Sequence, residues 1–169
     1  MAKVNAGRFT ADIDGDFVVF IIGMRINKLW KIHKWLPVAM AMPRMLRHLD
    51  QHPEEGLLGY RYAGLGRAPT LIQYWRSWDA LERFAQNADA PHLEPWRSFV
   101  RAVGSSGDVG IWHETYRVRS GEYEAVYGNM PLVGLAAATE LVPVGKKGKT
   151  AAFRIGARST DEAAVEPAD

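Results

Sequence analysis

One histidine lies on the apolar face of a short predicted helix that begins at Pro91. His92, Trp96, Phe99 and Val103 are four, three and four residues apart, so they share one side of that helix. A buried imidazole costs free energy unless its nitrogens have partners. The partner of His92 is either a backbone carbonyl, as in an ordinary core histidine, or a haem iron, whose macrocycle packs against flat apolar walls. Spacing alone does not choose between the two.

A second group of candidates lies on a predicted strand over residues 109–118. Alternation along a strand points Trp112, Glu114 and Tyr116 to one face and His113 to the other. A carboxylate between two aromatic side chains either forms an ion pair or faces a cavity, where it can transfer protons. We therefore take Glu114, His113 and Tyr116 as candidate catalytic residues, of which His113 and Glu114 should not share a pocket. The arginines that are candidates for an ion pair with Glu114 are Arg25, Arg61 and Arg76.

Composition excludes several kinds of chemistry. The chain has no cysteine, which rules out disulfides, iron–sulfur clusters and cysteine nucleophiles and is compatible with a reducing compartment. No metalloprotease-type helix motif or nucleophile elbow occurs. Gly64 and Gly66 lead into Pro69 rather than a helix, so they do not form a phosphate loop.

Charge and hydropathy limit the partners. There are 21 Lys plus Arg against 19 Asp plus Glu, a net charge of +2 that gives no electrostatic reason to expect nucleic acid. The longest apolar run, Phe17 to Met24, is too short to span a bilayer, and residues 1–8 lack a signal-peptide core. We expect a cytoplasmic protein without membrane insertion.

The elements that must position these residues follow a simple order. A helix with its N-cap at Ser77 lies between two predicted hairpin strands and the strand over 109–118. The complete order is strand, helix, strand, strand, helix, extra short helix, strand, which is the α+β ferredoxin-like βαββαβ plan. Its sheet has one uncovered face, so we expect a homodimer. The strands are predicted over residues 17–26, 57–63, 70–76 and 109–118, and the first helix over 32–49, with a kink or break at Pro43.

The rest of the chain is predicted to surround this domain. Residues 1–12 are expected to be a flexible N-terminus, and residues 13–143 the ferredoxin-like domain. Within it, residues 123–127 are predicted to add a further strand. Residues 144–169 form a C-terminal extension, which ends in a disordered tail because residues 159–169 are acidic and poor in large apolar side chains.

Several segments resemble a known family when they are taken together. They are WLPV at 35–38, MPRML at 42–46, GLLG at 56–59, QYWRS at 73–77, HLEPWRSF at 92–99, VGIWHETY at 109–116 and YGNMP at 127–131. This combination is similar to a bacterial and fungal family once known only as a domain of unknown function. That family is now grouped with the antibiotic-biosynthesis-type monooxygenase of the fumagillin pathway. The resemblance covers residues 16–143 and implies a dimeric α/β barrel.

The resemblance also implies chemistry. Its wider superfamily contains cofactor-free oxygenases and haem proteins, and in the haem-degrading members the iron-binding histidine lies near the end of the second helix region. His92 has a similar place, which favours haem with His92 as the metal ligand. Trp96 and Phe99 would then line the haem, and Trp75 and Trp112 would lie near the cofactor or substrate.

The expected function is that of a haem-binding oxidoreductase, a monooxygenase acting on a small or medium apolar molecule. Three alternatives stay open at this point, because a fold does not determine an activity. They are a cofactor-free monooxygenase, a haem lyase of the aldoxime dehydratase type, and a non-catalytic dimer that binds a hydrophobic ligand.

Overall fold

The computed structural model describes residues 2–87, 106–148 and 150–156 of the chain. The predicted helix with His92, Trp96 and Phe99, and the predicted tail at 159–169, lie outside these ranges.

The main sheet has four antiparallel strands in the order β3-β4-β2-β5. Its two long strands are the central β2 and the edge strand β5, which are paired along their whole length from Phe17 opposite Val118 to Ile26 opposite Val109. This strand order confirms the ferredoxin-like α+β prediction. The bounds are β2 Phe17–Ile26, β3 Leu57–Gly64, β4 Thr70–Trp75 and β5 Val109–Val118.

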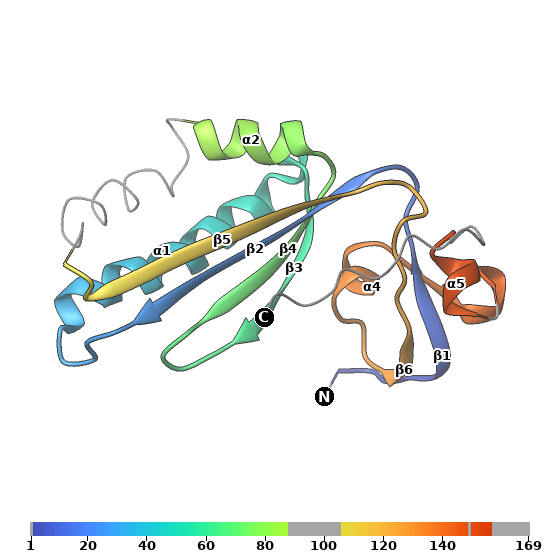
Figure 1. Cartoon of the computed structure of the whole chain (residues 1–169), viewed down its shortest axis with the longest axis horizontal. Helices are drawn as coiled ribbons and strands as arrows, with labels where there is room; N and C mark the ends of the chain where they lie inside the picture. Colours follow the sequence, from blue (N-terminus) through green and yellow to red (C-terminus); the bar gives the residue numbers. More distant parts are fainter. Residues whose placement is uncertain (1, 88–105, 149, 157–169) are drawn as a thin grey trace, which may run out of the picture.

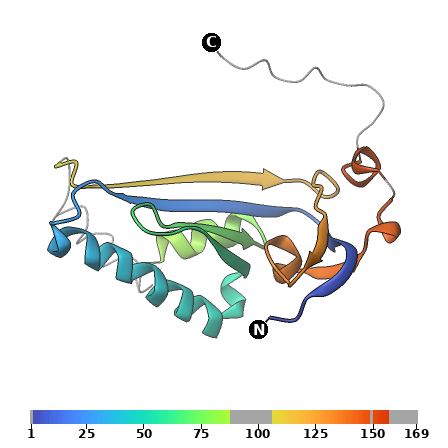
Figure 2. The same cartoon turned by 90° about the horizontal axis from the view of Figure 1, so that it is seen from below.

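Two helices cover one face of this sheet, α1 (Ile32–Gln51) and α2 (Trp78–Gln86), so the molecule has a helix layer and a sheet layer (Figures 1 and 2). The Ser77 side chain caps α2 by accepting a hydrogen bond of 3.1 Å from the Ala80 N–H. The predicted break at Pro43 does not occur. The proline has no N–H to donate to the Ala39 carbonyl, yet the helix continues through it to Gln51.

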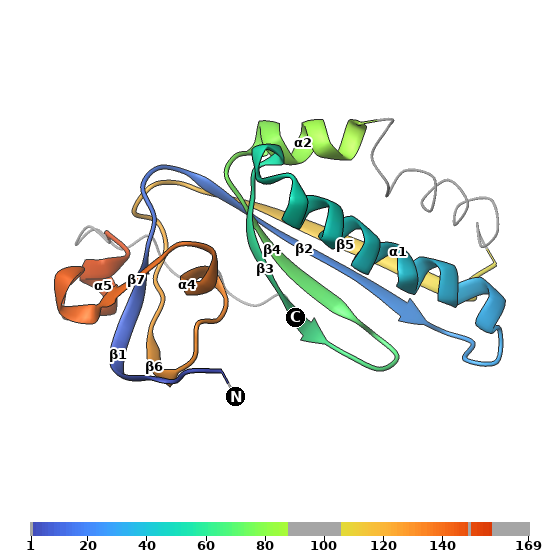
Figure 3. The ribbon, with the colours of Figure 1, turned by 180° about the vertical axis from the view of Figure 1, so that it is seen from behind.

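A second, three-stranded sheet lies beside the end of the first, in the order β6-β1-β7 (Figures 1 and 3). Its central strand is the N-terminal segment, which corrects the prediction of a flexible N-terminus at residues 1–12. The predicted strand at 123–127 is also shifted, because β6 begins only at Tyr127. The bounds are β1 Asn5–Asp12, β6 Tyr127–Met130 and β7 Glu140–Pro143.

Short helical turns attach this second sheet to the main one. The helix α4 (Leu135–Ala138) packs so closely on β3 that a Cβ atom at Gly59 would lie 2.8 Å from the Ala138 Cβ. The 3-10 turn η2 (Val144–Lys146) and α5 (Ala151–Arg154) follow β7. Arg154 holds α5 in place through a bond of 3.0 Å from its Nε to Glu124. The second sheet therefore covers part of the sheet face that the helices leave open.

Candidate functional site

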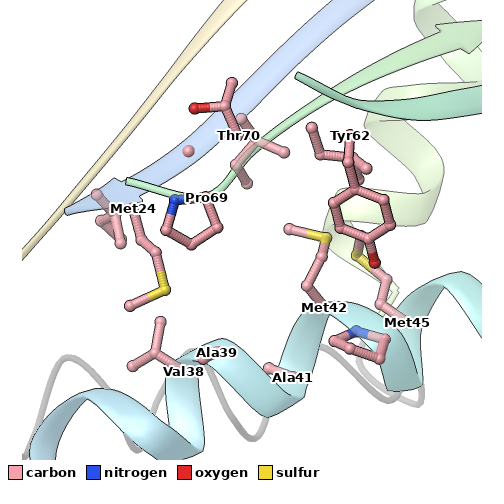
Figure 4. A pocket seen from close by; sticks show the side chains of 14 residues that line it. Met24, Val38, Ala39, Ala41, Met42, Met45, Tyr62, Pro69 and Thr70 are labelled. Atoms are coloured by element: carbon pink, nitrogen blue, oxygen red, sulfur yellow. The ribbon is translucent and has the colours of Figure 1, made fainter. Parts of the chain in front are cut away.

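An apolar cavity of about 260 Å³ lies between α1 and the main sheet (Figure 4). Figure 4 shows Met24 on one side and Met42 and Met45 on the other, with Tyr62 beside them. The other lining residues are also almost all apolar: Ile22, Gly23, Val38, Ala39, Ala41, Pro43, Pro69, Thr70, Leu71 and Ile111.

The cavity separates two core clusters. Met45 and Leu71 belong to a cluster that extends toward α2, whereas Met24 belongs to a smaller one at the other end of the sheet. Small side chains of α1, Ala39 and Ala41, lie between them and leave the space unfilled. The sequence therefore builds a gap in an otherwise continuous apolar layer.

The lining favours an apolar ligand. Its polar side chains are Tyr62, which is half exposed on the edge strand β3, and Thr70, whose hydroxyl donates to the Ala68 carbonyl at 3.2 Å. Ligand sites are commonly apolar hollows with few polar groups, and flexible methionines adapt to ligands of different shapes. The volume suits a small molecule.

His113 shares the cavity's side of the sheet. It lies opposite Ile22 in the register of β2 and β5, and it follows Ile111 by two residues on the same strand face. Ile22 and Ile111 both line the cavity. The imidazole packs against Phe20, with 5.6 Å between ring centroids. Of the pair His113 and Glu114, His113 is thus the residue on the helix-covered face.

Glu114 lies on the opposite, open face with Trp112 and Tyr116. The Tyr116 hydroxyl donates to Glu114 at 2.7 Å, and this bond to a carboxylate raises the pKa of Tyr116. The ion pair with Arg25, Arg61 or Arg76, one of the two alternatives that the sequence left open, does not form, since none of these arginines reaches Glu114 in the described parts of the chain.

Trp112 lies over the backbone of Gly23. A Cβ atom at Gly23 would be 2.6 Å from the indole nitrogen, so only a glycine lets the ring approach the sheet this closely. Trp112 is 41% exposed on the open face, away from the cavity between α1 and the sheet.

The position of Trp75 differs from the prediction that it lies near the cofactor or substrate. Its side chain is fully buried in the core against Phe84, so it does not line a cofactor or substrate cavity. Its indole N–H donates to the Gln73 side-chain oxygen at 2.8 Å. The Gln73 amide nitrogen has no hydrogen-bond partner in the described structure, although Gln73 is buried. These two polar groups form a paired but incompletely satisfied site inside the core.

The described cavity lining does not contain a ligand for haem iron. None of the residues that line the cavity is a histidine, and the described residues contain no cluster of three potential metal ligands. The described lining thus supplies apolar walls but no axial ligand. The predicted ligand His92 and its neighbours Trp96 and Phe99 are outside the described residues.

Sequence reasoning missed the cavity. Met42 and Met45 lie within the helix predicted over residues 32–49, but the sequence gave them no functional role. Tyr62 drew no attention because it lies on an ordinary edge strand. The usable signal was the pair of alanines, Ala39 and Ala41, in the middle of an otherwise bulky helix.

Comparisons with known proteins agree with this architecture. A family described as Monooxygenase af470-like matches residues 17–135. No curated protein matches the chain. Among solved structures, an aldoxime dehydratase has a TM-score of 0.57 at 18% identity, with 77% of this chain and 42% of that chain covered. The chain thus spans less than half the length of that structure.

Two smaller solved structures are more distant in shape. The cofactor-independent oxygenase SnoaB from Streptomyces nogalater has a TM-score of 0.41 at 17% identity, covering 62% of this chain and 94% of its own. A dimeric ferredoxin-like protein from Jannaschia has a TM-score of 0.40 at 16% identity, covering 57% and 97%.

Proposed function

The chain belongs to the Monooxygenase af470-like family, and we propose that it is a monooxygenase whose substrate is a small or medium apolar molecule. The observation that carries this proposal is the apolar cavity between α1 and the main sheet. Its walls would bind such a molecule by burying apolar surface, at about 25 cal/mol per Å² removed from water.

His113 is the candidate base for this reaction. A reduced substrate can itself deliver electrons to oxygen after it loses a proton, with the overall balance SH₂ + O₂ → SO + H₂O. The protein then needs to enclose the substrate and accept the proton. The cavity provides the enclosure. His113 is exposed and does not itself line the cavity, but β5 places it beside Ile22 and Ile111 of the cavity wall, which makes it the candidate proton acceptor.

Haem is a separate part of the proposal and depends on His92. The described cavity wall contains no axial ligand, so His92 would have to supply one. Reconstitution with hemin tests it directly: a Soret band that is lost in His92→Ala supports ligation by His92. If hemin does not bind, the haem-dependent alternatives, including an aldoxime dehydratase-type lyase, are wrong.

Oxygen uptake tests the activity. Purified protein is mixed with apolar hydroquinones and oxygen consumption is recorded. We expect His113→Gln to lower kcat by about 10²-fold or more, the usual contribution of a general base. Glu114→Gln is the matched control, because it changes the neighbouring residue on the opposite face and should leave kcat unchanged. If the protein binds these molecules but consumes no oxygen with any of them, the non-catalytic ligand binder is favoured instead.

The homodimer is proposed on the open sheet face. Trp112 and Tyr116 expose aromatic surface there, beside the region that α4 covers. Burial of such a surface by a second copy would remove it from water. Size-exclusion chromatography with light scattering over a range of concentrations tests this, and a monomer at every concentration would contradict it.

A further inference from the structure

A stripe of exposed apolar side chains runs along the outer side of α1. Ile32, Leu36 and Met40 are four residues apart, so they lie one above another on the helix, and all three are exposed. The inner side of the same helix carries the cavity and core residues, such as Met42 and Met45. An amphipathic helix normally exposes a polar face here, so this stripe is unusual.

The turn before α1 extends the stripe. Leu29 is half exposed, and Trp30 is 75% exposed, the largest exposure of any tryptophan in the described residues. The turn is held in this position, since the Trp35 indole N–H donates to the Leu29 carbonyl at 2.9 Å. Trp30 is therefore presented to solvent by a fixed turn and not by a loose loop.

The charged side chains that the chain itself carries along α1 and the turn before it are mostly basic. No Asp or Glu occurs between residues 17 and 49. Among the described residues, Asp108 reaches this region from elsewhere and forms ion pairs of 2.7 Å with Lys28 and with Lys31. Residues 17–49 contain six Lys and Arg side chains, of which Lys28 and Lys31 pair with Asp108, while Arg44 and Arg47 are exposed.

The start of α1 strengthens this positive field. No side chain caps its N-terminus, and its first turn contains no acid. The positive end of the helix dipole therefore lies beside Trp30 without the carboxylate that usually offsets it. Farther along, Arg44 and Arg47 are exposed on the same side as the apolar stripe.

We propose that this surface, formed by Leu29, Trp30 and the stripe Ile32, Leu36 and Met40, docks on an anionic lipid bilayer. Basic side chains interleaved with tryptophan and aliphatic groups are typical of helices that lie in the headgroup region of a bilayer. There the Lys and Arg side chains contact the lipid phosphate groups. Tryptophan prefers this interface because its ring is apolar and its N–H polar.

This docking is peripheral. No helix in the described part of the chain is both long and apolar enough to cross a bilayer. The cavity lies on the inner side of the same helix. The docking itself does not depend on the proposed activity, because vesicle binding needs no substrate.

Vesicle flotation tests the proposal with the full chain. We use vesicles of phosphatidylcholine with about 30% phosphatidylserine, beside vesicles of phosphatidylcholine alone, the first mimicking an anionic leaflet. We expect binding to the anionic vesicles that weakens with added salt. Each basic residue near the surface contributes roughly a fivefold factor, so Arg44→Gln with Arg47→Gln should weaken binding on the order of twentyfold.

The apolar contribution is tested by Trp30→Ser and Leu36→Ser. The matched control is Leu132→Ser, an apolar residue beside the second sheet whose exposure lies between those of Trp30 and Leu36. We expect at least a tenfold loss of vesicle binding in the first two variants and none in the control, with circular dichroism unchanged in all three.

Three results would overturn the proposal. Wild-type protein that does not float with anionic vesicles excludes the docking. Equal losses in Trp30→Ser and Leu132→Ser would show that the effect is not specific to this surface. A change of oligomeric state in Trp30→Ser, with vesicle binding retained, would assign the surface to a second copy of the chain.

Discussion

Filling the cavity with a larger side chain should weaken ligand binding while it raises the free energy of unfolding. Ala39→Leu adds three carbon atoms to a residue that lines the cavity of about 260 Å³. Leucine is a good helix former, so α1 should tolerate it. At about 0.8 kcal/mol for each buried carbon, the gross gain is up to about 2.4 kcal/mol, from which side-chain ordering and imperfect fit subtract.

The net expectation is an increase of about 1 kcal/mol in the free energy of unfolding, with loss of the binding space. For a chain of this size, 1 kcal/mol corresponds to a rise of about 2–4 °C in Tm. Denaturant unfolding measures the stability. Equilibrium dialysis with 1-naphthol, a small apolar aromatic alcohol, measures binding, which should fall at least tenfold.

The matched control is Ala151→Leu, because Ala151 is also helical but exposed on α5. It should change neither stability nor binding. If Ala39→Leu binds 1-naphthol as the wild type does, the cavity is not the binding site. If the variant is instead strongly destabilised, the space near Ala39 is closed in solution. The gain in unfolding free energy expected from filling the cavity is then wrong.

Three further predictions concern polar pairs. Two lysines hold the pKa of Asp108 well below its usual range, so this carboxylate stabilises the fold above about pH 4 and loses that effect as the pH falls toward its folded pKa. Asp108→Asn should lower stability at neutral pH and flatten its fall in acid, as measured by denaturant unfolding at several pH values. Trp75→Phe leaves the Gln73 oxygen without its donor and should cost about 1–3 kcal/mol in chemical denaturation; a smaller cost would mean that Gln73 finds another partner. Glu114→Gln removes the carboxylate that raises the pKa of Tyr116, so one tyrosine should titrate closer to its ordinary pKa of about 10 by phenolate absorbance. An unchanged titration curve would contradict the Tyr116 hydrogen bond.

The main sheet could be predicted because its signals are local. The strands at Phe17–Ile26 and Val109–Val118 were predicted residue for residue, since each is a long β-prone run with clear ends. The cap at Ser77 followed from its position before an apolar stripe. Alternation also separated His113 from Glu114 correctly.

Other features depend on partners far away in the chain. The segment Asn5–Asp12 carries a glycine and few large apolar residues, and it becomes a strand only because two later strands flank it. Trp75 and Trp112 were both predicted to lie near the cofactor or substrate, because periodicity does not say which face of each strand meets the helices. The pairing of Val18 with Trp75 decides this, since it brings Trp75 to the helix-covered face.

The central position of β1 has a consequence for how the protein forms during synthesis. Asn5 pairs with Met130, 125 residues later, and Phe9 pairs with Pro143. When the ribosome has completed the main sheet, the first strand of the chain still lacks both neighbours. Closing so long a loop is slow, and an unpaired strand can meet other nascent chains in the meantime. The strand β1 is thus synthesised well before both of its partners, and we expect the yield of folded protein to depend on the delay before they pair.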